Sequence, residues 1–173
     1  MIKKAERKDV CSIGKTYEEL LSFEAEHGSS SGWKLGVYPT EKFAAVRTAA
    51  GEMYVLGEDG EIRASMTLNQ DQAPEYREVH WQYPANDDEV LVIHTLCIPP
   101  SAAGKGYGTR MVGFTADSAA FRGCKVIRID TWLHNEPAKR LYLRNGFRIA
   151  GTGRIRLQGL IDEKQVYLER LIQ

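Results

Sequence analysis

The residues best suited to chemistry form a glycine-rich turn at positions 103–109, which follows an apolar segment and opens a helix. Its three glycines let the backbone approach a ligand closely. The free N–H groups of a first helical turn, together with the positive end of the helix dipole, favour a phosphate group. Lys105 adds a positive charge, so we expect this turn to bind an anion.

A nucleotide P-loop is another use of such a turn, but it needs a serine or threonine directly after the lysine to hold magnesium. Gly106 occupies that position. The sequence therefore argues against a magnesium nucleotide. Taken alone, the turn is also compatible with an ordinary tight loop.

A second candidate group lies at positions 135–147. Asn135 suits the N-cap of a helix, and Gly146 suits its end. Ala138 and Tyr142 share one face of the helix that this spacing predicts. Taken alone, the pattern favours a short capped helix whose tyrosine packs in the core with its hydroxyl satisfied.

Two strands and a helix between them must position both groups. Apolar residues run almost continuously from Val90 to Ile98, which is typical of a strand covered on both faces. Positions 126–131 predict a second strand, and the helix is expected at positions 106–122 because apolar residues recur there at intervals of four and three. A strand, a helix and a strand in this order form a right-handed crossover, so we expect a parallel pair. The predicted apolar face of the helix consists of Tyr107, Met111, Phe114, Ser118 and Phe121.

The rest of the sequence predicts further helices and strands. Asp9 and Thr40 each suit an N-cap, which predicts one helix ending near Gly28 and another ending near Gly51. Two strand-like runs around the turn at positions 57–60 predict an antiparallel hairpin. Other strands are expected at positions 2–6 and 166–171. With 173 residues and 43% apolar content, the chain is sized for one domain, residues 1–173.

Composition argues against several classes of protein. Lysine plus arginine and aspartate plus glutamate each total 23, so no net field attracts nucleic acid or an anionic membrane. No apolar run is long enough to span a bilayer, and the first residues lack the apolar core of a signal peptide, so a cytoplasmic protein is expected. The three cysteines and four histidines lack the close spacing of a zinc site, so we expect no metal.

Taken together, the two candidate groups resemble the GCN5-related N-acetyltransferase (GNAT) superfamily. In that family an apolar triplet at a strand end precedes a loop with glutamine or arginine, two residues, glycine, one residue, and glycine or alanine. The triplet is Leu96-Cys97-Ile98 here, and the loop is 103–108, with Ala103 in place of the glutamine or arginine. That departure removes a side chain but leaves the backbone amides available. The family's later block is matched at Asn135, Ala138, Leu141, Tyr142, Gly146 and Phe147.

The resemblance implies a single-domain α/β (α+β) fold, with a mixed, strongly twisted sheet of six or seven strands, helices on both faces and central strands that splay apart. Other similarities, including Arg128-Ile129-Asp130-Thr131, look like a subgroup of small bacterial acetyltransferases. The implied cofactor is acetyl-CoA, with its pantetheine between the central strands and its pyrophosphate on the glycine turn. The implied cofactor-binding residues are Leu96, Cys97, Ile98, Ala103, Gly104, Lys105, Gly106, Tyr107, Gly108, Thr109, Asn135, Ala138 and Tyr142, with Lys139 and Arg140 as weaker candidates.

Direct transfer of an acetyl group from a thioester to an amine needs a neutral amine, a polarised carbonyl and a proton for the departing thiolate. Tyr142 matches the family's acid. For the base, His94 is the first candidate, since strand alternation places it on one face with Val92 and Leu96. It is also similar to the base of arylalkylamine members of the family, although a histidine bonded in the core is an equal alternative. Other candidates are Glu24, Glu26, Glu78, Asp130 and water.

The acceptor is expected to be a primary amine of a small molecule or a protein. Four aromatic residues fall where the family places its acceptor-binding elements, and packing is the simpler role for each of them: Trp33, Tyr38, Tyr76 and Trp81. A homodimer is plausible because a terminal strand at 166–171 often meets a partner. The alternative function is a non-catalytic module or sensor that binds acyl-CoA, which the Ala103 departure favours and a retained Tyr142 disfavours.

Overall fold

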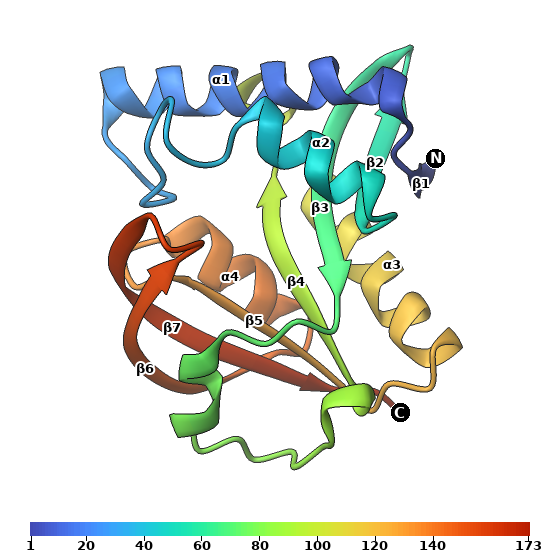
Figure 1. Cartoon of the computed structure of the whole chain (residues 1–173), viewed down its shortest axis with the longest axis vertical. Coiled ribbons are helices and arrows are strands. Elements are labelled where there is room, and N and C mark those ends of the chain that lie inside the picture. Colours follow the sequence, from blue (N-terminus) through green and yellow to red (C-terminus); the bar gives the residue numbers. More distant parts are fainter. The chain divides into compact units, whose positions relative to one another are not determined.

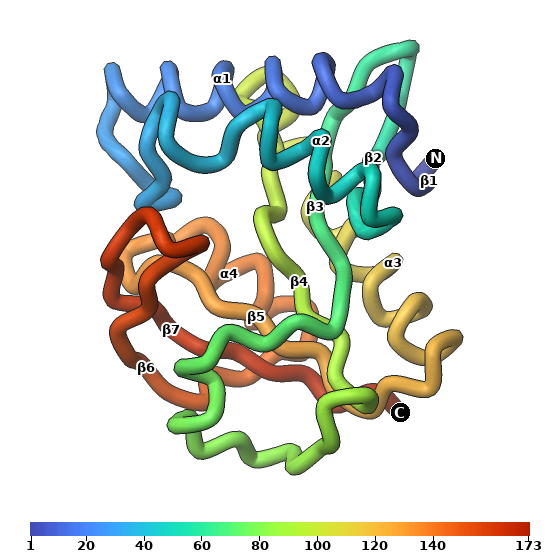
Figure 2. Tube along the Cα trace, in the orientation of Figure 1, coloured from blue at the N-terminus to red at the C-terminus, as the bar shows by residue number.

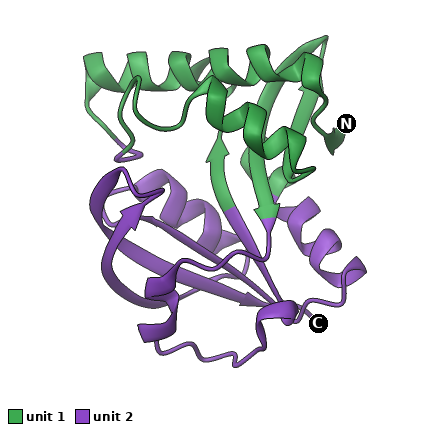
Figure 3. Ribbon diagram, in the orientation of Figure 1, with its two compact units in different colours: residues 1–29, 33–68, 94–111 green, residues 30–32, 69–93, 112–173 purple.

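The computed structural model describes residues 1–173, which form two compact units (Figure 3). Unit 1 comprises residues 1–29, 33–68 and 94–111, and unit 2 comprises residues 30–32, 69–93 and 112–173. The strands form one seven-stranded mixed sheet in the order β1-β2-β3-β4-β5-β7-β6. The α/β class and the expected number of strands are confirmed. That the chain is one domain stays a prediction.

The strands of unit 1 include the predicted hairpin. β1 (Ile2–Lys4) pairs antiparallel with β2 (Met53–Glu58), which pairs antiparallel with β3 (Glu61–Asn69). The hairpin turn is Asp59-Gly60, and both residues have a positive φ, 54° and 77°. Such a pair of left-handed residues matches the right-handed twist of the two strands.

The two helices of unit 1, α1 (Val10–His27) and α2 (Glu41–Ala49), lie side by side (Figure 1). The predicted N-cap of α2 is confirmed, because Thr40 Oγ1 accepts a hydrogen bond from the Phe43 N–H at 3.2 Å. The helices cover a cluster of buried side chains that holds this unit together: Ile13, Tyr17, Ala44, Met53, Val55 and Cys97.

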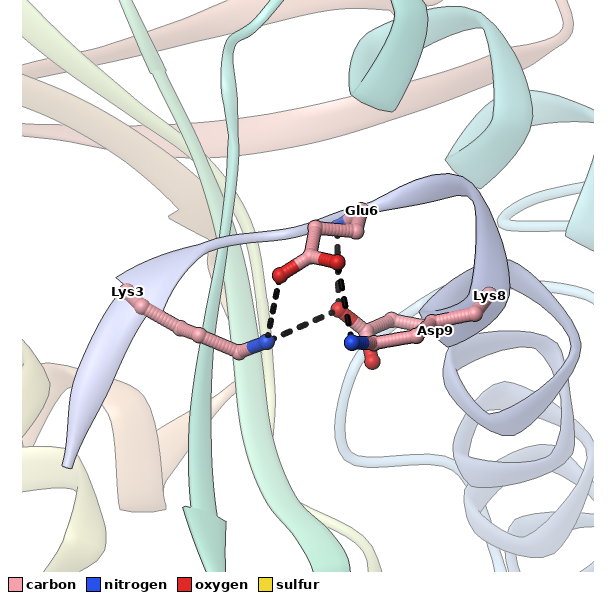
Figure 4. A network of polar contacts seen from close by, with 4 residues as sticks. All are labelled: Lys3, Glu6, Lys8 and Asp9. Atoms are coloured by element: carbon pink, nitrogen blue, oxygen red, sulfur yellow. Dashed lines mark hydrogen bonds and ion pairs between the residues drawn. The ribbon is translucent and has the colours of Figure 1, made fainter.

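The start of α1 corrects one expectation. Asp9 stands at the N-cap, but its side chain does not cap α1; its Oδ2 accepts a hydrogen bond from the Glu6 N–H at 2.9 Å, which closes the short helix η1 (Arg7–Asp9). Glu6 also pairs with Lys3 at 3.1 Å and Lys8 at 2.9 Å (Figure 4). Since these pairs are exposed, they contribute little stability.

Unit 2 contains an antiparallel part of the sheet. β7 (Ile161–Leu171) pairs with β5 (Val126–Trp132) on one side and with β6 (Arg148–Leu157) on the other. Strand β6 was not predicted from the sequence: less exposed positions alternate with exposed ones from Gly151 to Leu157, but two of the less exposed positions are the glycines Gly151 and Gly153. Because β7 lies between two strands, residues 166–169 have a strand on each side and are not a free edge, so the reason given for a homodimer is lost.

Between β3 and β4 the chain runs through two short helices of unit 2, η2 (Pro74–Glu78) and η3 (Asp87–Glu89), as the trace in Figure 2 shows. A further short helix, η4 (Pro100–Ala102), follows β4. The helix within the second candidate group is α4 (Glu136–Arg144).

The predicted crossover is present, and its strands are parallel. Val90–Val92 of β4 (Val90–Cys97) pair with Val126–Arg128 of β5. The connecting helix is α3 (Tyr107–Phe121). Residues Val90 to Ile93 are at most 1% exposed, as expected of a strand covered on both faces. On α3, Met111 is fully buried but Phe121 is 94% exposed, so the predicted apolar face does not reach the end of the helix.

How β4 and β5 run beyond their three paired residues stays a prediction, as does the expected cytoplasmic location. No helix in the structure has the length and apolar character needed to cross a membrane.

Candidate functional site

The glycine turn before α3 offers a row of unbonded amides. The Ala103 N–H donates to the Pro100 carbonyl at 3.1 Å, and the Arg110 N–H donates to the Gly106 carbonyl at 3.2 Å. The amides between these two positions belong to the turn and to the first turn of α3, whose leading N–H groups have no partner within a helix. They are therefore available to an anion, as the sequence predicts.

Two glycines give this turn its shape. Gly104 and Gly106 have φ values of 75° and 79°, in the left-handed region that favours glycine, and no atom lies within 4 Å of a Cβ built on either residue. Both residues are exposed, as is Lys105 between them, whose Nζ lies 3.4 Å from the Ser101 carbonyl. The backbone is thus open to a ligand on this side.

Two anchors within unit 1 hold the turn in place. The Tyr107 hydroxyl donates to the Glu58 carboxylate of β2, and the Ser101 N–H donates to Glu19 Oε1 of α1 at 2.8 Å. Tyr107 is only 4% exposed. The side chain of this predicted cofactor residue is therefore structural, and its backbone N–H is what it can offer a cofactor.

The end of β4 has an irregular backbone. Thr95 has a φ of 50°, which is uncommon for a threonine, and its hydroxyl hydrogen-bonds the Tyr38 hydroxyl. The left-handed residue interrupts the alternation that placed His94 and Leu96 on one face, and the role of His94 stays a prediction. Leu96 and Ile98 are half-buried, whereas Cys97 is fully buried.

The Cys97 side chain points into the core of unit 1. Its Sγ lies 3.9 Å from the Thr16 carbonyl, and burial raises the pKa of the thiol to about 12. The thiol therefore stays protonated and chemically inert, and only the backbone of Cys97 can contribute to a site.

The second candidate group forms the start of α4 in unit 2. Asn135 Oδ1 accepts a hydrogen bond from the Ala138 N–H at 3.1 Å, and its Nδ2 donates to Thr131 Oγ1 at 3.2 Å. The predicted cap is confirmed, and both ends of the amide serve to fix α4 to β5. Lys139 forms an ion pair with Glu136 on the same helix.

Tyr142, the proposed acid, is 2% exposed and packs against Phe147 with ring centroids 5.4 Å apart. Burial raises the pKa of its hydroxyl, and the carboxylate of Asp130 raises it further. No hydrogen bond contributes to this shift. The hydroxyl is therefore protonated at neutral pH and able to donate a proton.

Asp130 lies on β5 directly opposite Tyr167 of β7. The Tyr76 hydroxyl donates to Asp130 Oδ1 at 2.5 Å. Burial raises the pKa of Asp130 to about 6, although the bond from Tyr76 lowers it, and the same burial raises the pKa of Tyr167 to about 12. Unit 2 thus places a carboxylate of raised pKa among three tyrosines, of which Tyr142 is the third.

The four predicted acceptor-binding aromatics fall in different units, and each has a packing role. In unit 1, Trp33 packs edge-on against Tyr38 at 6.0 Å. In unit 2, Trp81 Nε1 donates to the Tyr76 carbonyl at 2.9 Å, and the Arg128 guanidinium lies 4.2 Å from the Trp81 ring centroid.

Two further polar residues of the site, Tyr167 and Glu169 of β7, were not singled out from the sequence. Glu169 is fully buried and lies opposite Arg128, while Tyr167 lies opposite Asp130. The sequence signal that could have found them is their spacing: Tyr167 and Glu169 are two positions apart in the last strand, as are Arg128 and Asp130 in β5, so each pair lies on one face of its strand. Because β6 was not recognised, the partners of the last strand could not be assigned.

Comparisons with known proteins agree with this architecture. One relative is the uncharacterised N-acetyltransferase YhfO of Bacillus subtilis (strain 168). A segment of 58 residues is 33% identical between the two proteins, and it covers 34% of this chain and 39% of that protein. The chain spans well under half the length of the curated relatives that it matches.

Two solved structures share the fold. A GNAT-family acetyltransferase from Streptococcus agalactiae 2603 matches with a TM-score of 0.79 at 19% identity, over 100% of this chain and 95% of that one. A GNAT-superfamily phosphinothricin acetyltransferase from Sinorhizobium meliloti, solved in complex with acetyl-CoA, matches with a TM-score of 0.71 at 16% identity, over 99% of this chain and 88% of that one.

A match to a family profile covers residues 16–147, which include the glycine turn, both strands of the crossover and α4. This is about three quarters of the sequence. The chain therefore belongs to the acetyltransferase (GNAT) family of acyltransferases.

Proposed function

We propose that the protein transfers an acetyl group directly from acetyl-CoA to a primary amine. The observation that carries the proposal is the set of unbonded amides at the glycine turn and the first turn of α3, which suits a pyrophosphate. Family membership supports acetyl transfer, and the relatives named as N-acetyltransferases support an amine acceptor.

The residues of the turn fit the cofactor. The open space over Gly104 and Gly106 leaves room for a pyrophosphate against the backbone, and Lys105 supplies a positive charge. Ala103 adds no side-chain donor, so binding rests on amides and the helix dipole. We assign the pantetheine to the backbone of residues 96–98.

Acetyl-CoA supplies an activated acyl group whose thiolate is a good leaving group. We assign to Tyr142 the proton that the thiolate takes up, because Tyr142 matches the family's acid and its hydroxyl is protonated at neutral pH. Backbone N–H groups of residues 96–98 are assigned to the thioester oxygen. His94 is kept as one base candidate for the acceptor amine.

The experiment measures release of coenzyme A from acetyl-CoA with a panel of primary amines. We expect steady, amine-dependent release and formation of the N-acetyl product. Tyr142→Phe should lower turnover about tenfold or more, with acetyl-CoA affinity within twofold of the wild type. Tight binding without release for every amine would instead support the non-catalytic module, and unchanged turnover in the variant would remove the role of Tyr142.

A further inference from the structure

One face of unit 2 carries two cross-strand pairs of polar residues. Arg128 and Asp130 of β5 share this face because side chains alternate along a strand, and β7 places Glu169 and Tyr167 opposite them. The face therefore holds two carboxylates, two positions apart, whose surroundings differ.

Glu169 is fully satisfied by the protein. Its carboxylate accepts hydrogen bonds from the Gln82 N–H at 2.8 Å and the Tyr83 N–H at 3.3 Å, and it pairs with Arg148 at 2.5 Å. It is fully buried, so no ligand can reach it. These contacts assign Glu169 a structural role.

Asp130 differs on each of these points. It is half-buried rather than fully buried, and it receives one side-chain hydrogen bond, from Tyr76 at 2.5 Å. No basic side chain pairs with it, because the guanidinium of Arg128 lies over Trp81 and donates to Gln72 Oε1 at 2.7 Å and the Tyr83 carbonyl at 3.2 Å. Asp130 is thus a half-buried carboxylate without a positively charged partner, and a cationic ligand could supply that partner.

The groups around Asp130 suit an organic cation. The ring of Tyr76 lies 5.6 Å from that of Tyr167, edge to face, and both side chains are 3% exposed. The two rings pack against each other and against Trp81, so they wall the site, and the carboxylate itself attracts an ammonium group through the Coulomb interaction. The carboxylate of Asp130 also raises the pKa of Tyr142, the proposed proton donor.

We propose that Asp130 binds the protonated amine of the acceptor and takes up a proton from it. The substrate is therefore a primary alkylammonium ion small enough to reach this half-buried carboxylate. This inference rests on the proposed function. One N–H bond of the ammonium breaks and its proton passes to Asp130 and then to solvent. The freed lone pair forms the C–N bond as the C–S bond of the thioester breaks. Tyr142 gives its proton to the sulfur, and a second N–H proton restores Tyr142.

The protonation of Asp130 matches this role. Its pKa of about 6 leaves the carboxylate ionised at neutral pH, and a base with a pKa near the working pH is efficient. The titratable and charged groups that face this region are Glu75 and Tyr76 on η2, Tyr142 on α4, Tyr167 on β7 and Arg128 on β5. The hydrogen bond from Tyr76 holds the pKa of Asp130 down, so its removal should raise that pKa.

The test measures kcat/KM for the best amine substrate from pH 5 to pH 9, and acetyl-CoA affinity by calorimetry. For Asp130→Asn we expect a loss of about a hundredfold or more at pH 7, disappearance of the acidic limb, and acetyl-CoA affinity within twofold of the wild type. Tyr76→Phe should retain the limb but move it to higher pH. Asp117→Asn, an exposed carboxylate on α3, is the control and should match the wild type.

The variant His94→Gln tests the competing assignment of His94 as the base. An acidic limb that persists in Asp130→Asn, or that disappears in His94→Gln instead, overturns the role of Asp130 and leaves acetyl transfer intact. Absence of transfer by the wild type to every amine overturns both proposals. If Asp130→Asn does not fold, the displacement of the limb in Tyr76→Phe decides, and an unmoved limb refutes the proposal.

Discussion

Replacing Asp130 with asparagine should stabilise the protein in a pH-dependent way. In the folded chain the pKa of Asp130 is about 6, because burial disfavours the carboxylate, whereas the unfolded chain has the ordinary value of 3.8. Well below pH 3.8 both states are protonated and the wild type keeps its full stability. As the pH rises from 3.8 to 6, the unfolded chain ionises Asp130 while the folded chain still holds its proton, so stability is lost, and the loss levels off once the folded state ionises above pH 6. Asparagine never ionises, so it escapes this loss.

The size of the effect follows from linkage. A difference of about 2 pKa units corresponds to about 3 kcal/mol, reached above pH 7, and about 2 kcal/mol of it should develop between pH 4.5 and pH 8. Urea unfolding followed by circular dichroism gives the free energy of unfolding at each pH for wild type and Asp130→Asn. Only the change of the difference with pH is compared, since the substitution also alters the bond from Tyr76.

Asp117→Asn, at an exposed position, controls for a general effect of charge and should give a curve parallel to that of the wild type. Parallel curves for Asp130→Asn as well would refute the reasoning, because they would mean that Asp130 titrates alike in the folded and unfolded chain. This measurement needs no substrate, and so it tests the site independently of activity.

Further predictions concern the glycine turn and the buried carboxylate of β7. Gly104→Ala should leave the protein folded but weaken acetyl-CoA binding about tenfold in calorimetry, because a left-handed alanine costs about 1–2 kcal/mol and the turn would relax. Gly113→Ala, within α3 and with nothing within 4 Å of its Cβ, should bind normally; equal losses in both would refute the role of the turn. Glu169→Ala should lower the free energy of unfolding by about 3 kcal/mol, since two amides and Arg148 lose their partner. Asp162→Ala, which removes an exposed pair with Arg156 at 3.2 Å, should cost less than about 1 kcal/mol, and similar costs would contradict the structural role of Glu169.

Local signals in the sequence predicted the elements that carry the site. The caps at Thr40 and Asn135 each satisfy a backbone N–H three residues later, so their side chains alone locate the helix starts. The hairpin followed from turn residues, and β4 from a continuous apolar run. These features depend on neighbours in the sequence, which is why they could be found without a structure.

The features that depend on distant residues could not be predicted in this way. Strand β6 has glycines, Gly151 and Gly153, at two of its less exposed positions, so its sequence carries no apolar alternation, and the position of β7 between β5 and β6 followed only from their pairing. The raised pKa of Asp130 results from burial by other elements, and the bond that holds it down comes from Tyr76, 54 residues away. The left-handed backbone at Thr95 likewise has no local signature, although it alters the argument for His94.

Calorimetric titration of the folded protein with acetyl-CoA tests the central claim most directly, with S-acetylpantetheine, which lacks the pyrophosphate, as the matched ligand. If the amides between Ala103 and Arg110 hold a pyrophosphate, acetyl-CoA should bind one molecule per chain and S-acetylpantetheine at least tenfold more weakly. No detectable binding of acetyl-CoA, or equal affinity for the two ligands, would contradict the account.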